Sequence, residues 1–187
     1  MRGFTLIELM VTITVLGVLS VFAYPSYANF IQNTQIRSAA ESVVSGLQIA
    51  RAEAIRGNKN VQFQLLNTSA TSTVTGGGGT DWSVVSAAAA TPTVFDQTVQ
   101  TRYESSATSK ARVGTATTAS ATVATAGAGM PATITFTGMG RTTTTIQQLD
   151  FTGASGTRNL RVLIAPGGDV RLCDPAFALS ANPQGCS

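Results

Sequence analysis

The chain contains no histidine among its 187 residues. Histidine is the commonest general base near neutral pH and the commonest metal ligand, so its absence removes Ser-His and Cys-His catalytic pairs and most transition-metal sites. The nine carboxylates are scattered along the chain, and the glycine run Gly76–Gly79 lacks the Lys-Ser/Thr that follows a phosphate-binding loop. We therefore predict a protein with no enzymatic activity, no cofactor and no metal site.

Charged and aromatic residues are also scarce, at 11% and 6% of the chain. The net charge of +3 permits contact with nucleic acid but does not demand it. Alanine, threonine, serine and glycine fill the composition, which suits an extracellular β-rich domain better than a cytosolic enzyme. About 130 residues remain beyond the long N-terminal helix described below, enough for one compact domain with its own core.

Only two cysteines are present, Cys173 and Cys186, with twelve residues between them. An even number of cysteines in an exported domain predicts a disulfide. Closing a loop of this size would stabilise the fold by about 3 kcal/mol in the chain-entropy model. No other soft ligand lies nearby in the sequence, which disfavours a metal site or a free thiol.

The chain has a single long apolar run, the 21 residues from Phe4 to Tyr24, in which Glu8 is the only charge. As a helix this run would be roughly 30 Å long, the thickness of a bilayer core. A secretory signal peptide has a shorter apolar core and ends in an A-x-A site, which is absent here. We therefore predict a retained membrane span. A carboxylate near the centre of a span costs about 2.5–3.5 kcal/mol of insertion free energy, so we expect Glu8 to have a partner.

The GFTLIE stretch at residues 3–8 resembles the leader junction of type IV pilins and type II secretion pseudopilins. In that family a prepilin peptidase cleaves after the glycine and methylates the new amino terminus. The resemblance implies cleavage between Gly3 and Phe4, N-methylation of Phe4, and pairing of Glu8 with the Phe4 amine of a neighbouring subunit during assembly. The alternative is an ordinary membrane anchor with a chance glutamate.

The resemblance implies three parts of the chain. They are a leader at 1–3, a transmembrane and assembly half-helix at 4–28, and a periplasmic or extracellular domain at 29–187. An apolar stripe with a 3.6-residue period extends the helix beyond Pro25, so we predict one helix from about Thr5 to Arg56, ended by Gly57-Asn58. The stripe is formed by Ile36, Ala40, Val43, Leu47, Ala50 and Ala54.

For the remainder of the chain we predict strands and loops. The predicted fold class is therefore α+β, with the helix packed on an antiparallel sheet. We predict loops at Asn67–Thr80 and Ser105–Gly129, where large apolar residues are almost absent. Strands are predicted at Val61–Leu65, Trp82–Val85, Thr93–Phe95, Ile134–Phe136, Ile146–Phe151, Leu160–Ala165 and Val170–Cys173.

This order of elements resembles the type IV pilin fold, and in detail the GspH/FimT group of minor pilins and pseudopilins. The resemblance covers most of the chain except Ser86–Met130. It is carried by LQIARAEA at 47–54, DWS at 81–83, ITF at 134–136 with Gly140-Arg141, and GDVRLCDP at 168–175.

The last two predicted strands form a hairpin around the turn Pro166–Asp169. A register that places Ile164 opposite Val170 puts the apolar residues on one face and leaves Arg161 and Arg171 as diagonal neighbours on the outer face.

Adjacent arginines can hold phosphates. Some FimT-type pilins bind DNA through a Gly-Arg-x-Arg motif, but here the matching stretch has Asp169 in place of the first arginine. Binding of double-stranded DNA by Arg171, helped by Arg161, Arg158 or Arg141, is therefore a hypothesis. The alternative is that these arginines are solvated or pair with Asp169 and Asp174.

The resemblance implies a minor pilin that assembles into a type IV pilus or primes it, with a contribution to DNA uptake in natural transformation as a further hypothesis. Its partners would be other major and minor pilin subunits and the prepilin peptidase. It would cross the bacterial inner membrane once before assembly and then reach the pilus and the cell surface. The alternative is a GspH-like minor pseudopilin of a type II secretion system without DNA binding.

Overall fold

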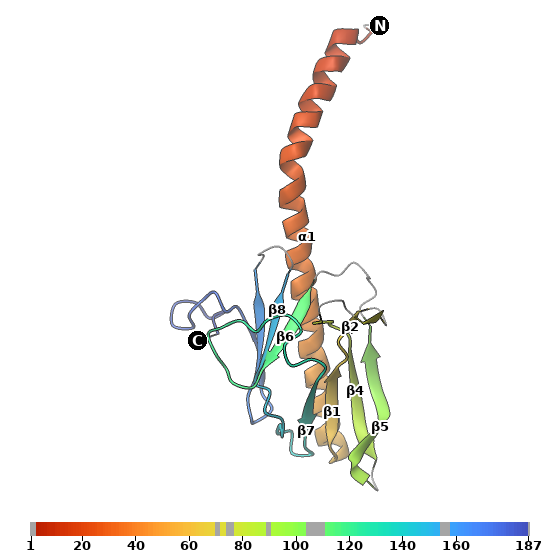
Figure 1. The fold of residues 1–187 in the computed structure, drawn as a ribbon, viewed down its shortest axis with the longest axis vertical. Helices are drawn as coiled ribbons and strands as arrows, with labels where there is room; N and C mark the ends of the chain where they lie inside the picture. The colour runs from red at the N-terminus through yellow and green to blue at the C-terminus, as the bar shows by residue number, and fades with distance from the viewer. Residues whose placement is uncertain are drawn as a thin grey trace.

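A computed structural model of the chain describes residues 3–69, 72–73, 77–88, 91–103, 111–153 and 158–186. One 52-residue helix, α1 (Leu6–Gly57), is about 78 Å long and dominates the shape. Its first half projects away from a β-rich domain, and its second half runs along that domain (Figure 1). The predicted helix is confirmed to within a residue at each end.

Both ends of α1 are capped. The Thr5 side chain accepts a hydrogen bond from the Glu8 backbone N–H at 3.3 Å. At the other end Asn58 adopts a left-handed conformation (φ 43°, ψ 45°), and its N–H bonds the carbonyls of the last turn. In that turn, the hydrogen bond donated by the Arg56 guanidinium lowers the pKa of Glu53.

The described residues of the domain form two four-stranded sheets and a short hairpin, and all the strand pairs within them are antiparallel. The first sheet has the order β5 (Thr91–Arg102), β4 (Trp82–Ala88), β1 (Val61–Leu65) and β7 (Ala132–Phe136). The second has the order β10 (Val170–Cys173), β9 (Leu160–Ile164), β8 (Gln148–Thr152) and β6 (Arg112–Ala116). The hairpin pairs β2 (Thr68–Ser69) with β3 (Ser72–Thr73).

The core lies between α1 and the two sheets. All six residues of the apolar stripe are fully buried, together with large side chains such as Phe63, Trp82 and Phe151. The Trp82 indole N–H donates a hydrogen bond to Ser42 Oγ at 2.9 Å, which satisfies its one polar atom. Gly46 allows this close approach, because a Cβ there would lie 2.6 Å from the Phe63 ring and 3.0 Å from the Trp82 ring.

Several strands differ from their predictions. The expected loop at Ser105–Gly129 contains β6, and the loop at Asn67–Thr80 contains the β2–β3 hairpin; residues 70–71, 74–76 and 104–110 lie outside the described part. In β6 a Cβ at position 114 would lie 2.1 Å from the Thr125 carbonyl oxygen, so glycine is required there. A strand built around Gly114 and small residues has no strong apolar alternation, which is why its sequence does not predict it.

Within the described part of the chain, no helical stretch has both the length and the mean hydropathy of a membrane span. The span predicted for Phe4–Tyr24 is therefore not confirmed. It includes residues 21–24, whose side chains lie outside the described part.

We predict that Gly46→Ala lowers the free energy of unfolding by roughly 1–2 kcal/mol. The overpacking that a new methyl group causes against two buried rings outweighs the gain of about 1 kcal/mol in helix propensity. Chemical denaturation of the purified chain measures the change. Gly167→Ala is the matched control, because nothing lies within 4 Å of a Cβ there. Equal stabilities of the two variants would contradict this account of the core.

Candidate assembly segment and arginine sites

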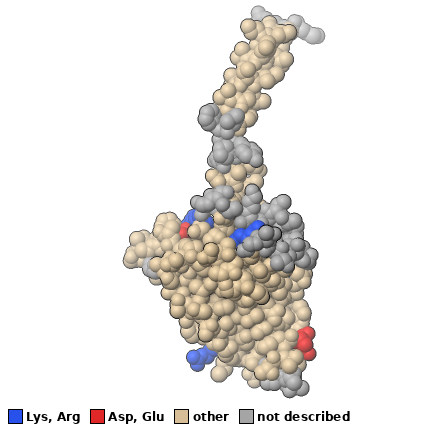
Figure 2. All heavy atoms as spheres, in the orientation of Figure 1, with Lys and Arg blue, Asp and Glu red and all other residues tan. Residues whose placement is uncertain are grey.

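The projecting half of α1 exposes an apolar surface on every side. Phe4 is 82% exposed and Leu16 is 67% exposed. No charged residue occurs between Glu8 and Arg37 in the sequence, and the described part of the projecting helix shows no charged side chain on the face drawn in Figure 2. The other large exposed apolar residues here are Leu6, Ile7, Leu9, Met10, Val11, Ile13, Val15, Val18 and Leu19.

Three hydroxyl groups on the described part of the projecting helix are already satisfied. Thr12 donates to the Leu9 carbonyl at 2.9 Å, Thr14 to the Met10 carbonyl at 2.9 Å, and Ser20 to the Leu16 carbonyl at 2.8 Å. A hydroxyl bonded to its own helix does not need a partner from water. These three hydroxyl groups can therefore enter a dry, apolar environment without losing a hydrogen bond.

Glu8 lies in the first turn of α1, three residues after the capping residue Thr5. The Thr-x-x-Glu spacing is that of a capping box, and a negative charge at this position is favoured by the helix dipole. Its side chain is exposed. Gly3 and Phe4 precede the helix, where a peptidase can reach them. Cleavage, methylation and the pairing of Glu8 stay predictions, and Met1 and Arg2 of the expected leader lie outside the described part.

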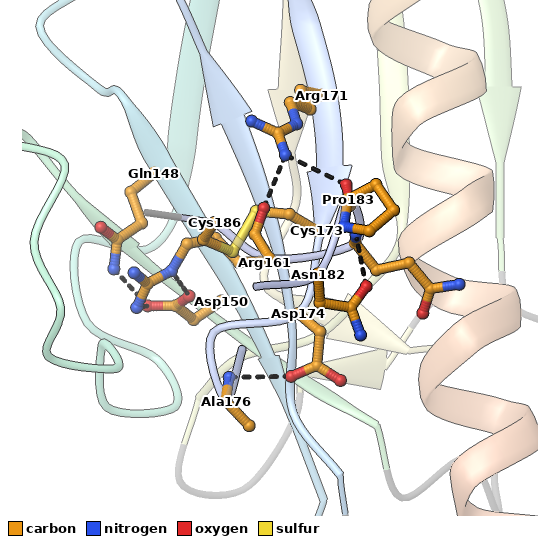
Figure 3. Close-up of a disulfide and its surroundings, with 12 residues drawn as sticks. Gln148, Asp150, Arg161, Arg171, Cys173, Asp174, Ala176, Asn182, Pro183 and Cys186 are labelled. Atoms are coloured by element: carbon orange, nitrogen blue, oxygen red, sulfur yellow. Dashed lines mark hydrogen bonds and ion pairs between the residues drawn. A yellow bond between two sulfur atoms is a disulfide. The ribbon is translucent and has the colours of Figure 1, made fainter. Parts of the chain in front are cut away.

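The predicted disulfide between Cys173 and Cys186 is present, with a Cα–Cα separation of 5.1 Å. It fastens the C-terminal tail beside the end of β10 (Figure 3). The Asp174 N–H also donates to the Gln184 carbonyl at 2.7 Å, so backbone pairing supports the same loop.

The predicted hairpin register is confirmed as well. Val170 lies opposite Ile164, Leu172 opposite Val162, and Cys173 opposite Arg161. Val162 and Ile164 are buried in the core, as the alternation of apolar residues requires.

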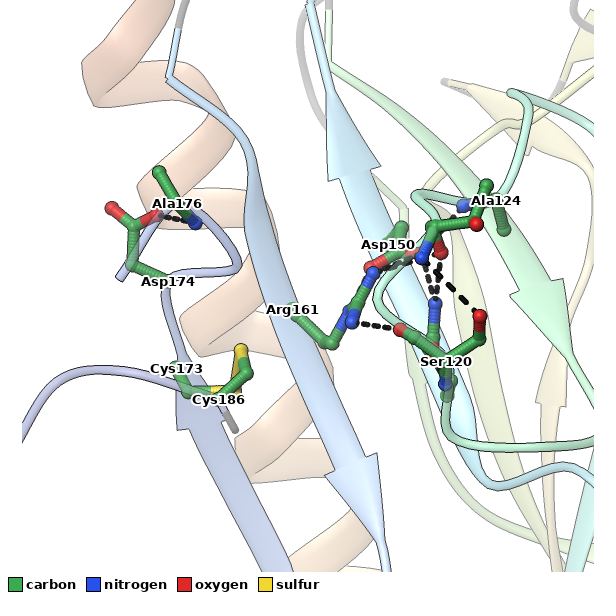
Figure 4. Close-up of polar contacts among 10 residues, drawn as sticks. Ser120, Ala124, Asp150, Arg161, Cys173, Asp174, Ala176 and Cys186 are labelled. Carbon is green, nitrogen blue, oxygen red and sulfur yellow. Dashed lines mark hydrogen bonds and ion pairs between the residues drawn. A yellow bond between two sulfur atoms is a disulfide. The ribbon is translucent and has the colours of Figure 1, made fainter. Parts of the chain in front are cut away.

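Arg161 does not lie on an open outer face. The expectation that its guanidinium is open to a phosphate group is therefore wrong. The residue is 3% exposed. Its Nε donates to Asp150 Oδ1 at 2.6 Å, and its terminal nitrogens donate to the carbonyls of Ser120 and Thr122 (Figure 4). Asp150 lies directly opposite Arg161 across β8 and β9. The segment around Ser120 covers this face of the second sheet and turns it into a polar interior.

Three further groups belong to this buried network, namely the backbone N–H groups of Ala124 and Ser120 and the side chain of Gln148. The Ala124 N–H donates to Asp150 Oδ2 at 2.6 Å, and the Ser120 N–H donates to Gln148 Oε1 at 2.8 Å. Gln148 Nε2 returns a hydrogen bond to the Thr122 carbonyl at 3.0 Å. The sequence alone did not predict this role of Gln148 and Asp150. The available signal was a strand with polar residues at alternate positions, opposite an arginine on the next strand.

Arg158 and Arg171 are partly accessible but already hold partners of their own chain. The Arg158 guanidinium pairs with the buried carboxylate of Asp174 and lies 5.6 Å from the centroid of the Phe177 ring. Arg171 donates to the Gly185 carbonyl at 2.6 Å and more weakly to that of Pro183 at 3.4 Å. The alternative of pairing with Asp174 is thus confirmed for Arg158.

Arg141 is exposed and follows the tight Gly138–Gly140 segment after β7. The next residue, Thr142, bonds the Pro166 carbonyl at 3.2 Å, which places Arg141 near the β9–β10 turn. The four arginines therefore do not present one open cluster, because the other three contact different groups of their own chain. Within the described residues, no group of histidine, cysteine and acidic side chains could hold a metal ion.

Comparison with known proteins gives two matches to family models. The model described as "Type II transport protein GspH" matches residues 39–168, and the model described as "Prokaryotic N-terminal methylation motif" matches residues 1–24.

Two curated relatives each match about a third of the chain. A type IV major fimbrial protein FimA of Dichelobacter nodosus is 41% identical over 58 residues, 31% of this chain and 35% of that protein. A fimbrial protein of Pseudomonas aeruginosa is 40% identical over 60 residues, 32% of this chain and 38% of that protein. The chain thus matches little more than a third of the length of these relatives.

Among solved structures, the type IV minor pilin FimU of Pseudomonas aeruginosa superposes with a TM-score of 0.52 at 18% identity. The match covers 84% of this chain and 99% of FimU. The similarity confirms the predicted type IV pilin fold.

We predict that Arg161→Ala lowers the free energy of unfolding by about 3–5 kcal/mol, since it leaves the buried Asp150 carboxylate without its cation. Arg141→Ala, at an exposed position, should change it by less than about 0.5 kcal/mol. Urea denaturation of the two variants side by side measures the difference. Similar small losses in both would show that the Arg161 guanidinium is solvated.

Proposed function

The chain belongs to the GspH family, whose members are structural and not enzymatic, and on this basis we propose that it is a minor pilin of a type IV pilus. The observation that carries the proposal is the projecting apolar half of α1, which begins at an N-terminal methylation motif. The subunit would enter the filament, or prime its assembly, through this half-helix.

The exposed apolar surface needs a cover. Burying one large aliphatic or aromatic side chain is worth about 1.5–3 kcal/mol, and more than ten such side chains are exposed on the projecting half. Before assembly we infer that lipid covers them, with one pass through the bacterial inner membrane. After assembly the helices of neighbouring major and minor pilin subunits would replace the lipid, and the domain would reach the pilus and the cell surface.

Processing and docking would both use the first residues. A prepilin peptidase would cleave between Gly3 and Phe4 and methylate the Phe4 amine. Glu8, the only charge before Arg37 on this helix, would pair with the Phe4 amine of a neighbour as it enters the filament. In a low-dielectric surrounding, each charge offsets much of the desolvation of the other.

We favour a pilus over a type II secretion system for this subunit. The two curated relatives described above are fimbrial proteins, and the solved fold that the chain resembles is that of a minor pilin. The disulfide-closed tail also resembles the tails of pilins. A GspH-like pseudopilin of a secretion system is the alternative, and isolation of the filament that contains the subunit distinguishes the two.

We predict that Glu8→Ala blocks assembly. The variant should accumulate in the membrane fraction and be cleaved normally, but should be absent from sheared filaments, because the Phe4 amine of its neighbour is left unpaired. Immunoblotting of membrane and filament fractions measures this. Glu41→Ala is the control, since Glu41 is an exposed acidic residue of the same helix and, among the described residues, forms an ion pair with Arg37. Normal incorporation of the Glu8 variant would overturn the proposal.

A contribution to DNA uptake is a narrower hypothesis with less support. Arg161 is buried, and the guanidiniums of Arg158 and Arg171 are engaged within the chain. Asp169 is exposed in the turn where the DNA-binding motif would have an arginine. Phosphate contact would have to rest on Arg141 and on the accessible edges of Arg158 and Arg171.

We predict that the full chain in detergent binds duplex DNA no more tightly than the non-specific range, about 10⁻⁴–10⁻⁶ M at physiological salt. Titration at several salt concentrations, repeated with Arg171→Gln and Arg141→Gln, tests this. Tighter binding whose salt slope falls by about one with each substitution would establish a DNA-binding pilin despite Asp169.

A further inference from the structure

We propose that a pocket at the junction of α1 and the domain binds the headgroup of an anionic phospholipid before the subunit assembles. This neck pocket has a volume of about 430 Å³. Its helical wall is formed by Phe30, Asn33, Thr34 and Arg37, and its opposite wall by Arg158 and by residues of β9, β10 and the C-terminal tail. The inference rests on the proposed function, in which α1 crosses the inner membrane once before assembly, and adds a ligand for the domain.

The spacing of charges along α1 places the neck pocket at the depth of lipid headgroups. Arg37 follows Glu8 by 29 positions, and no charged residue lies between them. Along the helix these two residues are roughly 43 Å apart, and a bilayer with both of its headgroup layers is about 40–45 Å thick. When Glu8 lies at one face of the membrane, Arg37 therefore lies in the headgroup layer of the other face. Tyr27, which is 66% exposed, precedes it on the apolar side, as interfacial tyrosines do in membrane proteins.

Two guanidinium groups give the neck pocket its positive charge. The side chains of Arg37 and Arg158 are 72% and 52% exposed, and they come from opposite walls. The Arg158 backbone N–H donates to Asn33 Oδ1 at 3.3 Å, which holds it one helical turn from Arg37. Figure 2 shows basic side chains on the domain where the projecting helix leaves it. A phosphate group between the two walls can thus meet both cations.

The ion pairs of these arginines leave room for a phosphate group. Arg37 uses its Nε to bind Glu41 Oε1 at 2.7 Å, and an exposed i,i+4 pair of this kind contributes little stability, so a phosphate can draw Arg37 away. Arg158 also uses its Nε for its pair with the buried Asp174 carboxylate. Among the described residues its terminal nitrogens form no hydrogen bond, so they can donate to phosphate oxygens while Asp174 stays paired.

The rest of the lining suits the other parts of a phospholipid. Phe30 is 68% exposed, and Leu160 and Leu172 are only partly buried against the core. These side chains offer an apolar surface to the first methylene groups of the acyl chains. Asn33 and Gln184 add amide groups that can bind glycerol oxygens. An inorganic anion would leave the apolar part of the lining uncovered, so the combination favours a lipid.

The order of these groups along α1 also matches the orientation of a lipid in the membrane. Phe30 precedes Arg37 by seven positions, about 10 Å along the helix axis. The apolar end of the neck pocket therefore lies toward the projecting half, where acyl chains would cover the helix, and the cationic end lies toward the domain. A lipid bound in this way would hold the domain at the membrane surface until the subunit enters the filament.

Lipid retention by the full chain tests the proposal. Purified in a neutral detergent and measured by native mass spectrometry at equal lipid concentrations, the chain should retain phosphatidylglycerol about tenfold more than phosphatidylcholine, whose choline places a cation beside the phosphate. Arg37→Gln should reduce the retention of phosphatidylglycerol about fivefold, through the loss of one charge-assisted contact. Arg56→Gln should leave it unchanged. This variant is the matched control, because Arg56 is an exposed arginine of α1 that pairs with Glu53 and does not line the neck pocket.

Other results of this measurement would overturn the proposal. Equal retention of the two lipids, or equal losses in the two variants, would show that the neck pocket does not select the headgroup. Displacement of the lipid by inorganic phosphate at the same concentration would show a general anion site. Displacement by duplex DNA would show a nucleic-acid site instead of a lipid site.

Photocrosslinking locates the lipid on the chain. A photoreactive amino acid replaces Thr34, which lines the neck pocket, or Thr98, on the exposed strand β5. In membranes of cells that express the full chain, mass spectrometry should find phospholipid attached at position 34 and not at position 98. Attachment at neither position, or at both to the same extent, would reject the site.

Cell fractionation separates a failure of this inference from a failure of the proposed function. If the parent chain occurs in the membrane fraction and in sheared filaments but shows no preference for phosphatidylglycerol, the neck pocket alone is rejected. If the expressed parent chain is absent from both fractions, the proposed minor-pilin function is rejected as well.

Discussion

The structure depends on the burial of one helical stripe that two sheets share. The second half of α1 contacts β4, β1 and β7 of the first sheet and β10, β9 and β8 of the second. Among the described strands the two sheets exchange no ladder pairing, so the helix is the element common to both. Gly46, on the same half of the helix, lies against Phe63 of β1 and Trp82 of β4 and sets how near the first sheet can lie. The same packing fixes the direction in which the projecting half leaves the domain (Figure 1).

The two halves of α1 thus require opposite surroundings. Its second half is amphipathic and stable in water once the sheets cover the stripe. Its first half is apolar all round and stable only when lipid or other helices cover it. The helix is assigned continuously through both halves, and Pro25, which has no backbone N–H to donate, lies between them. The segment from Tyr27 to Arg37 lies at the transition between the half that needs an apolar cover and the half that is stable in water.

The sequence predicts best what depends on local periodicity. The helix bounds follow from the stripe and from Gly57-Asn58, and the β9–β10 register follows from the alternation that buries Val162 and Ile164. The disulfide follows from composition alone. What the sequence does not predict depends on contacts between distant segments. Strand β6 is one case. Position 114 must be glycine because the Thr125 carbonyl leaves no room for a Cβ, and this requirement produces no apolar pattern. The division into two sheets is another, since strand patterns do not specify strand partners.

Arg161 shows why a candidate site fails in the same way. Alternation correctly placed it on the face of the hairpin opposite the core, but alternation does not say what covers that face. Ser120 and Thr122, about forty residues earlier, supply carbonyls to its guanidinium, and Asp150 supplies the counter-charge. A buried guanidinium is tolerated only when its donors and its charge are matched, and this one is matched throughout. Arg158 and Arg171 are likewise engaged by the tail, so three of the four candidate arginines hold segments of their own chain together. Among the described residues, the large exposed apolar side chains gather on the projecting helix.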